Sequence, residues 1–301
     1  MHPVLFKVPL LGWEVYSFGV LLGLSLLVGW FLVHRLAARQ GFPRNTVADG
    51  FVLTVVGGLL GARLQYVLTN MEEFGNPIAV LRITEGGLAA YGGLLGGVVV
   101  SWLYMRRKNL STLLWLDMLV PAVAIGVVLT RIGCFLHGCD FGLVAENLAW
   151  GVEFPAGTPV FAEHLKQRLV MDWAEWSQPV YPVQIYWVVA GLVILALTAV
   201  AWRVRRFAGQ VFLLATVAYA GATFGTELFR GDPDRGWLWM WSISQVIAAA
   251  TTVAAVVLYA VRRRACRRDP AQAFCIGPGI DAAREAEAPS EVRHDDRGGG
   301  A

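Results

Sequence analysis

The residues with the clearest chemical potential lie together in residues 130–142, which read TRIGCFLHGCDFG. They follow an apolar run at residues 118–129 and comprise Arg131, Cys134, His137, Cys139 and Asp140. An ionisable group at the end of a hydrophobic segment is costly unless it is paired or acts on something. In a membrane protein such a group therefore marks a candidate functional site. Arg131 has the strongest signal of this set, and its alternative interpretation is an arginine that extends to the lipid headgroups.

The elements that must position these residues follow from composition. Of 301 residues, 56% are hydrophobic and 16% are charged, and the mean hydropathy is +0.54. A soluble globular protein could not bury this much apolar material. Apolar runs near the length needed to cross a bilayer predict an all-α polytopic membrane protein with about seven transmembrane helices. The runs are residues 15–33, 46–68, 87–105, 113–129, 182–202, 211–229 and 243–261.

The loops between these runs predict the orientation. Arginine and lysine cluster after the first, third, fifth and seventh runs, whereas the opposite loops are mixed or acidic. By the positive-inside rule the N-terminus lies outside and the C-terminus lies in the cytoplasm. The predicted domains are a membrane domain at residues 1–268 and a disordered cytoplasmic tail at residues 269–301. Between helices four and five, a small external head is expected at about residues 143–181, with an amphipathic helix at residues 161–176 lying on the membrane.

This orientation brings polar side chains of several helices to one level. Residues near the outer ends of the predicted helices are Tyr16, Arg63, Tyr91, Arg131, Gln184, Tyr186 and Glu227. Their convergence predicts a site in the outer leaflet, open to lipid and to the external face. Structural alternatives exist for several of them. Tyr16 could belong to the aromatic belt, Arg63 could extend to the headgroups, and Glu227 could form a local ion pair with Arg230 at i+3.

The cysteines allow two interpretations. Cys134, His137 and Cys139 could bind a metal, but their Cys-x4-Cys spacing lacks a second ligand cluster, so no metal site is predicted. A disulfide between Cys134 and Cys139 is plausible on the oxidising side of the membrane. The two remaining cysteines are expected to be free thiols on the cytoplasmic side: Cys266 and Cys275.

Several motifs, in order along the chain, resemble the prolipoprotein diacylglyceryl transferase family. They are GARLQYVL (61–68), EGGLAAYGGLLGG (85–97), RIGCFLHGCDFG (131–142), WGVEFP (150–155), YPVQIY (181–186), ELFRGDPD (227–234) and the Ser242/Gln245 pair. The resemblance covers nearly the whole membrane portion and leaves out the tail.

The resemblance implies an enzyme of the bacterial inner membrane. Such an enzyme moves diacylglyceryl from phosphatidylglycerol to the lipobox cysteine thiol of a prolipoprotein and releases glycerol phosphate. The implied partners are phosphatidylglycerol, the prolipoprotein signal peptide and membrane lipid, with no cofactor, no metal and no nucleic acid. Arg131 matches the arginine of the family signature and would bind the phosphate, because a guanidinium group binds phosphate in a bidentate fashion.

The chemistry sets the remaining roles. A thiol with an ordinary pKa of about 8.5 needs a base or a cationic field to become a nucleophile. The catalytic candidates are Arg131, Glu227, Tyr91 and His137. The candidates for substrate binding are Tyr16, Arg63, Arg131, Gly142, Gln184, Tyr186 and Arg230. Among these, Tyr16, Gly142 and Glu227 match positions that the family treats as functional.

The chain also departs from the family pattern. Tyr91 stands where the family has a histidine, the usual candidate base, and Thr223 replaces an arginine. The other departures are Cys134 and His137 for asparagine, Cys139 for glutamate, Tyr181 for histidine and Trp187 for glutamate. Three hypotheses follow: a transferase in which Glu227 or His137 takes the thiol proton, a divergent paralogue acting on another headgroup or acceptor, and a non-enzymatic lipid-binding protein. Intact Arg131 and Glu227 favour an enzyme.

Overall fold

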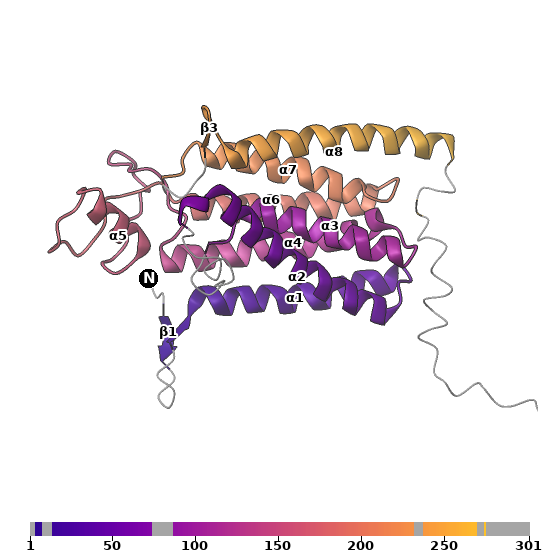
Figure 1. Cartoon of the computed structure of the whole chain (residues 1–301), viewed down its shortest axis with the longest axis horizontal. Helices are drawn as coiled ribbons and strands as arrows, with labels where there is room; N and C mark the ends of the chain where they lie inside the picture. Colours follow the sequence, from indigo (N-terminus) through magenta and orange to yellow (C-terminus); the bar gives the residue numbers. More distant parts are fainter. Residues whose placement is uncertain (1–3, 8–13, 74–86, 232–236, 270–273, 275–301) are drawn as a thin grey trace, which may run out of the picture.

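Long helices packed side by side make up most of the structure (Figure 1). This computed structural model describes residues 4–7, 14–73, 87–231, 237–269 and 274. The bundle helices are α1 (Ser17–Arg39), α2 (Arg44–Thr69), α3 (Ala90–Arg107), α4 (Thr112–His137), α6 (Val183–Val204), α7 (Gln210–Glu227) and α8 (Ile243–Arg268). Five of them, α1, α2, α4, α6 and α8, are long and apolar enough to cross a membrane. The prediction of an all-α polytopic membrane protein is therefore confirmed.

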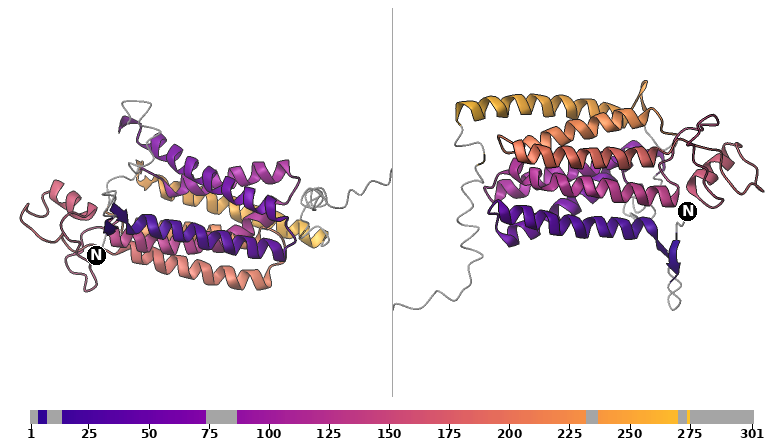
Figure 2. Two further views of the ribbon diagram at one scale, coloured as in Figure 1. Left: turned by 90° about the horizontal axis from the view of Figure 1, so that it is seen from below. Right: turned by 180° about the vertical axis from the view of Figure 1, so that it is seen from behind.

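Short elements gather at one end of the bundle. Strands β1 (Val4–Lys7) and β2 (Glu14–Tyr16) form an antiparallel pair, as do β3 (Trp237–Leu238) and β4 (Trp241–Ser242). Helix α5 (Pro159–Lys166) lies beyond the bundle at the same end, whereas α8 ends at the opposite end (Figures 1 and 2). A single 3-10 turn, η1 (Met71–Glu73), follows α2.

Helix α4 is longer than the sequence predicts. The expected helix ended at residue 129, but α4 continues to His137 and ends at Gly138, whose φ of 81° is left-handed. Polar side chains in the last turns do not interrupt a helix whose backbone hydrogen bonds remain intact, and glycine ends it because only glycine adopts this conformation without strain. Arg131, Cys134 and His137 are consequently held on the last two turns of a helix.

Glycines bring α2 and α3 into close contact. A Cβ atom on Gly61 would overlap the carbonyl oxygen of Gly92, and one on Gly96 would overlap the carbonyl oxygen of Gly57. Two helix backbones can approach this closely only where side chains are absent. This contact sets where Arg63, two residues after Gly61 on α2, lies relative to the start of α3.

The head differs from its predicted form. Helix α5 covers only Pro159–Lys166, and Arg168 adopts a φ of 60°, so the amphipathic helix expected over residues 161–176 is wrong in extent. Thr158 caps α5 by accepting a hydrogen bond from the Phe161 amide, and Pro159 occupies the first turn, where its missing N–H costs nothing. The apolar face of α5 packs inside the head itself: Phe141, Phe154, Val160 and Val180 form its buried core.

At the opposite end of the bundle, a buried carboxylate joins α4 to α7. Asp117 on α4 is fully buried and accepts hydrogen bonds from the amides of Gly209 and Phe212 at 2.7 and 2.8 Å. It thereby satisfies free amides at the start of α7. Asp117 is therefore an interface residue between α4 and the start of α7.

Some predictions fall outside the described residues. These are the tail beyond residue 269 apart from Phe274, the Glu85 and Gly86 positions of one motif, residues 232–234 of another, and Cys275.

Candidate functional site

Charged side chains from two helix ends and one loop meet around Asp140. Arg131 Nη1 donates to Asp140 Oδ2 at 2.5 Å, and Arg230 Nη2 donates to Asp140 Oδ1 at 3.4 Å. Arg230 Nη1 also donates to Glu227 Oε1 at 3.1 Å, so the predicted i, i+3 pair is confirmed. Asp140 therefore links the arginine of α4 to the arginine that follows α7, in one charged cluster of Arg131, Asp140, Arg230 and Glu227.

The end of α4 places Asp140 in this cluster. The amides of Gly138 and Cys139 both donate to the Cys134 carbonyl oxygen, at 2.8 and 3.1 Å. This Schellman-type end reverses the chain within a few residues. Asp140 then adopts a left-handed φ of 52°, a conformation that aspartate tolerates better than most residues. The turn directs its carboxylate back towards Arg131 on the helix.

The cluster controls the ionisation of Asp140. Burial alone would raise the pKa of its carboxyl group. The charges of Arg131 and Arg230, with hydrogen bonds from Cys134 and Arg131, outweigh burial and lower the pKa of Asp140 below its ordinary value. Asp140 is consequently an anion at neutral pH and a poor proton acceptor.

The loop around Gly142 ties the site to α6 and α7. The Gly142 amide donates to the Tyr181 carbonyl oxygen at 3.1 Å, and the Leu143 amide donates to the Phe229 carbonyl oxygen at 2.8 Å. A Cβ atom at residue 142 would overlap the Tyr181 carbonyl oxygen. Gly142 therefore contributes to the site by allowing close backbone packing, a structural role for a residue predicted to bind substrate.

Aromatic rings connect Arg131 to Tyr91. The guanidinium group of Arg131 lies 5.2 Å from the Trp187 ring, which lies 5.1 Å from the Tyr219 ring. Tyr219 in turn lies 5.7 Å from Tyr91. The Tyr91 hydroxyl donates to Thr223 Oγ1 at 3.1 Å, and both residues are buried. Two departures from the family pattern, Tyr91 and Thr223, are thus partners of each other.

The remaining candidates surround this centre. Gln184 is fully buried and donates to the Cys139 carbonyl oxygen at 2.7 Å. The Tyr186 ring lies 6.0 Å from the Phe229 ring. Tyr16 lies at the start of α1, 47% exposed, with its ring 6.2 Å from His137. Towards α3, Arg63 donates to the Gly87 carbonyl oxygen at 3.1 Å.

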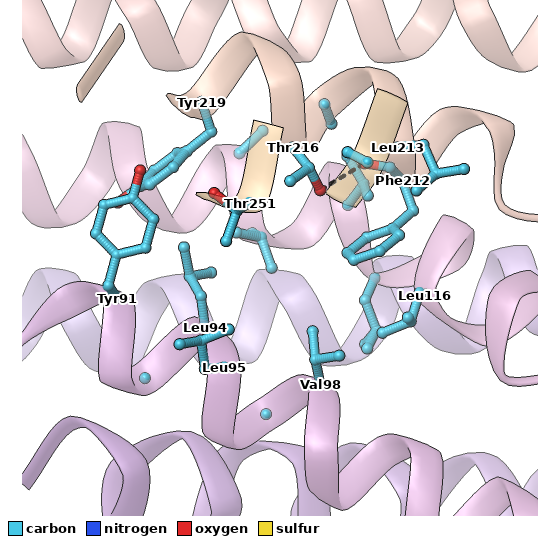
Figure 3. Close-up of a pocket in the computed structure, with 18 of the residues that line it drawn as sticks. Tyr91, Leu94, Leu95, Val98, Leu116, Phe212, Leu213, Thr216, Tyr219 and Thr251 are labelled. Atoms are coloured by element: carbon cyan, nitrogen blue, oxygen red, sulfur yellow. Dashed lines mark hydrogen bonds between the residues drawn. The ribbon is translucent and has the colours of Figure 1, made fainter. Parts of the chain in front are cut away.

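An apolar cavity opens beneath Tyr91 and Tyr219. Its volume is about 430 Å³, and residues of α2, α3, α4, α6, α7 and α8 line it. In Figure 3 the two tyrosines lie next to one another at one end, and Leu116, Phe212 and Leu213 lie at the other. Few polar groups interrupt this lining, so the cavity suits hydrocarbon.

Two thiols also lie beside the charged cluster. The sulfur atoms of Cys134 and Cys139 and a carboxylate oxygen of Asp140 are all within 4.8 Å of one another, which would allow a metal to bind. This group differs from the one considered from the sequence, in which His137 was the third ligand. Both thiols are free in the structure, as is Cys266.

Asp140 belongs to the polar stretch first singled out in the sequence, but no catalytic or binding role was predicted for it. Its signal was present, because the family pattern has a glutamate at the position of Cys139, and the following residue of this chain is an aspartate. Only the left-handed turn brings this displaced carboxylate to Arg131.

Comparison with known proteins agrees with the motif order. The family model described as prolipoprotein diacylglyceryl transferase matches residues 3–261. The chain belongs to this family. Curated relatives named phosphatidylglycerol–prolipoprotein diacylglyceryl transferase include those of Clostridium tetani, Shouchella clausii and a Wolbachia of Drosophila simulans.

The similarity extends over most of each chain. The Clostridium tetani protein is 28% identical over 263 residues, which cover 87% of this chain and 98% of the relative. The Shouchella clausii protein is 29% identical over 83% of this chain and 86% of the relative. The Wolbachia protein is 30% identical over 86% of this chain and 94% of the relative. The similarity to the diacylglyceryl transferase family therefore extends over most of the chain, and the family model ends at residue 261.

Proposed function

We propose that this chain is a phosphatidylglycerol–prolipoprotein diacylglyceryl transferase. The observation that carries the proposal is the charged cluster, in which Asp140 links Arg131 and Arg230, above an apolar cavity of about 430 Å³. Arg131 lies over the Trp187 ring, which contacts Tyr219 in the cavity lining. Cations close to a hydrocarbon-lined cavity suit a phospholipid, whose phosphate needs cations and whose acyl chains need apolar surface. Family membership supports the same reaction.

The reaction divides among the site residues as follows. The sulfur of the lipobox cysteine forms a bond to the glyceryl carbon, and the bond from that carbon to the phosphate oxygen breaks. Arg131 and Arg230 stabilise the negative charge on the departing glycerol phosphate, and Asp140 holds both guanidinium groups in place. The thiol proton passes to Glu227 or His137. Tyr91 is a poor base because an unperturbed tyrosine titrates near 10, so its role is to shape the lipid site beside Thr223.

The membrane arrangement belongs to the same proposal. Seven helices cross the bacterial inner membrane: the five long apolar ones together with α3 and α7, each of 18 residues. The N-terminus lies outside, the C-terminus lies in the cytoplasm, and the head at about residues 143–181 is external. The positive-inside rule implies this orientation, because arginines such as Arg267 and Arg268 lie in the last turn of α8. The site then faces the outer leaflet, where phosphatidylglycerol and the prolipoprotein signal peptide enter.

A second candidate is a divergent paralogue that acts on another headgroup or acceptor. The observation that favours it is the Tyr91–Thr223 hydrogen bond. Tyr91 and Thr223 are both uncharged and occupy the positions of the family's histidine and second arginine. Compared with the family pattern, this site therefore has less positive charge to bind a phosphate and lacks the usual base. A purely lipid-binding protein is the third hypothesis, and the retained arginines and Glu227 count against it.

The test is transfer from labelled phosphatidylglycerol to a lipobox peptide by the purified protein. We expect turnover, and a loss of about a hundredfold or more in Arg131→Ala, because a charge-stabilising donor is removed. Arg131→Lys should keep only part of the activity, since lysine cannot bind phosphate in a bidentate fashion. The surface variant Lys166→Ala is the matched control, because Lys166 lies on α5 in the head. Normal turnover in Arg131→Ala would exclude the phosphate role.

A further inference from the structure

Cys134 and Cys139 are brought together by the way α4 ends. Cys134 lies on the last turn of the helix, and Cys139 is the residue directly after the left-handed Gly138. The Cys139 amide donates to the Cys134 carbonyl oxygen at 3.1 Å. In a Schellman-type end the side chains at these two positions face each other across the turn. Their sulfur atoms accordingly lie within 4.8 Å of one another.

The two thiols differ in what surrounds them. Cys134 is 5% exposed, and its S–H donates to Asp140 Oδ2 at 3.4 Å. Cys139 is only partly buried, and its S–H donates to the Cys134 carbonyl oxygen at 3.8 Å. A reagent therefore reaches Cys139 first, and the buried thiol of Cys134 lies in position to attack the resulting sulfur. Thiol–disulfide exchange requires this order, an accessible sulfur and a resolving partner.

We propose that Cys134 and Cys139 form a reversible disulfide that ties the loop carrying Asp140 to the end of α4. The two thiols lose two protons and two electrons to a disulfide oxidant, which is released as two thiols, and one sulfur–sulfur bond forms in the chain. The inference rests on the proposed outward orientation for its source of oxidant, because disulfides persist in oxidising compartments.

The geometry favours a disulfide over a metal. Asp140, the third group within reach of the sulfur atoms, is already bound to Arg131 and Arg230. A metal ion would have to compete with these guanidinium groups for the carboxylate, whereas a disulfide uses only the two sulfur atoms, which lie within 4.8 Å of one another. The bond removes the Cys134 donor from Asp140 and leaves the carboxylate with its two arginines. It also restrains the turn that sets the distance between Asp140 and Arg131.

Peptide mass distinguishes these outcomes. Trypsin releases residues 132–166 as one peptide, in which Cys134 and Cys139 are the only cysteines. Protein purified from membranes without reductant is alkylated in denaturant and digested, and the peptide masses are measured by mass spectrometry. We expect this peptide to be unalkylated and to have the mass of the reduced peptide minus two hydrogens. After treatment with dithiothreitol we expect it to be doubly alkylated. Double alkylation before reduction, persisting after incubation of the folded protein with oxidised dithiothreitol, would overturn the proposal.

Protection without the mass loss has a different meaning. In that case the two thiols would resist alkylation in the folded protein until a chelator is added, and the peptide would show no loss of two hydrogens. This result would show a bound metal and overturn the disulfide.

Thermal unfolding in detergent gives a second readout that does not depend on transferase activity. We expect dithiothreitol to lower the Tm of the native protein by a few degrees, because the cross-link restrains the unfolded chain. Cys139→Ser should show the lowered Tm with or without reductant. Cys266→Ser is the matched control, since Cys266 contacts the Arg206 carbonyl oxygen at the other end of the bundle, and it should keep the shift. An equal response in Cys139→Ser and the native protein would contradict the assignment.

Discussion

At the scale of single residues, the site pairs each charge with a partner. Arg131 and Arg230 share Asp140, and Glu227 binds Arg230 from one turn away. A buried arginine without a partner would be costly, so this pairing holds the guanidinium groups in place before any substrate arrives. Asp140 provides the carboxylate that the family pattern places one residue earlier. Within the same turn, a carboxylate thus lies directly after the position at which Cys139 departs from the family pattern.

Tyr91 and Thr223 should behave as a coupled pair. Their side chains share a buried hydrogen bond. In the Tyr91→His variant, the new histidine would lie beside threonine and not beside the arginine of the family pattern. In the Thr223→Arg variant, the new arginine would place a buried charge beside tyrosine. We expect each single variant to lose transfer activity and the double variant to regain at least tenfold over either one. A double-mutant cycle on turnover measures this coupling. Additive effects would mean that the two departures are independent.

At the scale of elements, close backbone contacts decide where the polar residues lie. Helices α2 and α3 touch through glycines, and α4 ends at a glycine that turns Asp140 back to the site. The loop after α4 is pinned to α6 and α7 through backbone hydrogen bonds of Gly142 and Leu143. Each of these contacts depends on the absence of a side chain more than on the presence of one.

Gly61→Ala should destabilise the bundle. Its new Cβ atom would overlap the Gly92 carbonyl oxygen, and backbone cannot yield as a side chain can, so we expect a loss of about 1–3 kcal/mol. Gly221→Ala on α7 is the matched control, because no atom lies within 4 Å of its new Cβ. Thermal unfolding of both variants in detergent measures the difference. Equal Tm values for the two would contradict the close contact.

The head should lose stability in mild acid. His164 on α5 is buried, and its Nδ1 accepts a hydrogen bond from the Gln178 amide at 3.2 Å. Burial lowers the pKa of His164, against the opposing charge of Glu163. His164 therefore binds a proton less readily in the folded head than in the unfolded chain. The contribution of neutral His164 to the stability of the head is present above about pH 6.5 and is lost as the pH falls below that value.

His164→Asn separates this effect from other titrations. Asparagine retains an acceptor close to the position of Nδ1 but does not titrate. Proteolysis of the head loop between pH 7 and pH 5 should accelerate more in the native protein than in this variant. The same acceleration in both would assign the pH dependence to other groups.

At the scale of the whole molecule, the bundle has chemically distinct ends. The end near α5 carries the charged cluster, the thiols of Cys134 and Cys139 and the short strands. The other end carries Cys266 and the buried Asp117 junction. This asymmetry makes the orientation in the membrane testable with the chain's own cysteines.

A thiol reagent that cannot cross membranes should label cysteines at only one end of the bundle in sealed cells. After reduction we expect label on Cys139, with Cys134 reacting more slowly because it is buried, and no label on Cys266 until the cells are permeabilised. Cys139→Ser serves as the control for assignment. Labelling of Cys266 alone in sealed cells would invert the proposed orientation.

Much of this architecture is determined by the sequence alone. Apolar runs must be buried in lipid or in one another, and they predict the helices to within a turn or two wherever hydrophobicity ends abruptly. Arg131, Glu227 and Arg230 were predicted because ionisable groups at such places are costly without a function or a partner. Gly57 and Gly61 lie four residues apart and therefore on one helix face, where small residues allow close helix packing.

Only the tertiary structure decided which residues become partners. The end of α4 could not be found from hydrophobicity, because its last turns are polar yet remain helical until Gly138. Asp140 reaches Arg131 through a left-handed turn, and Tyr91 reaches Thr223 across two helices far apart in sequence. Spacing along a chain fixes the face of one helix, whereas the pairing of side chains depends on how several helices pack at once. The site is therefore foreseeable residue by residue, but its connections are a property of the fold.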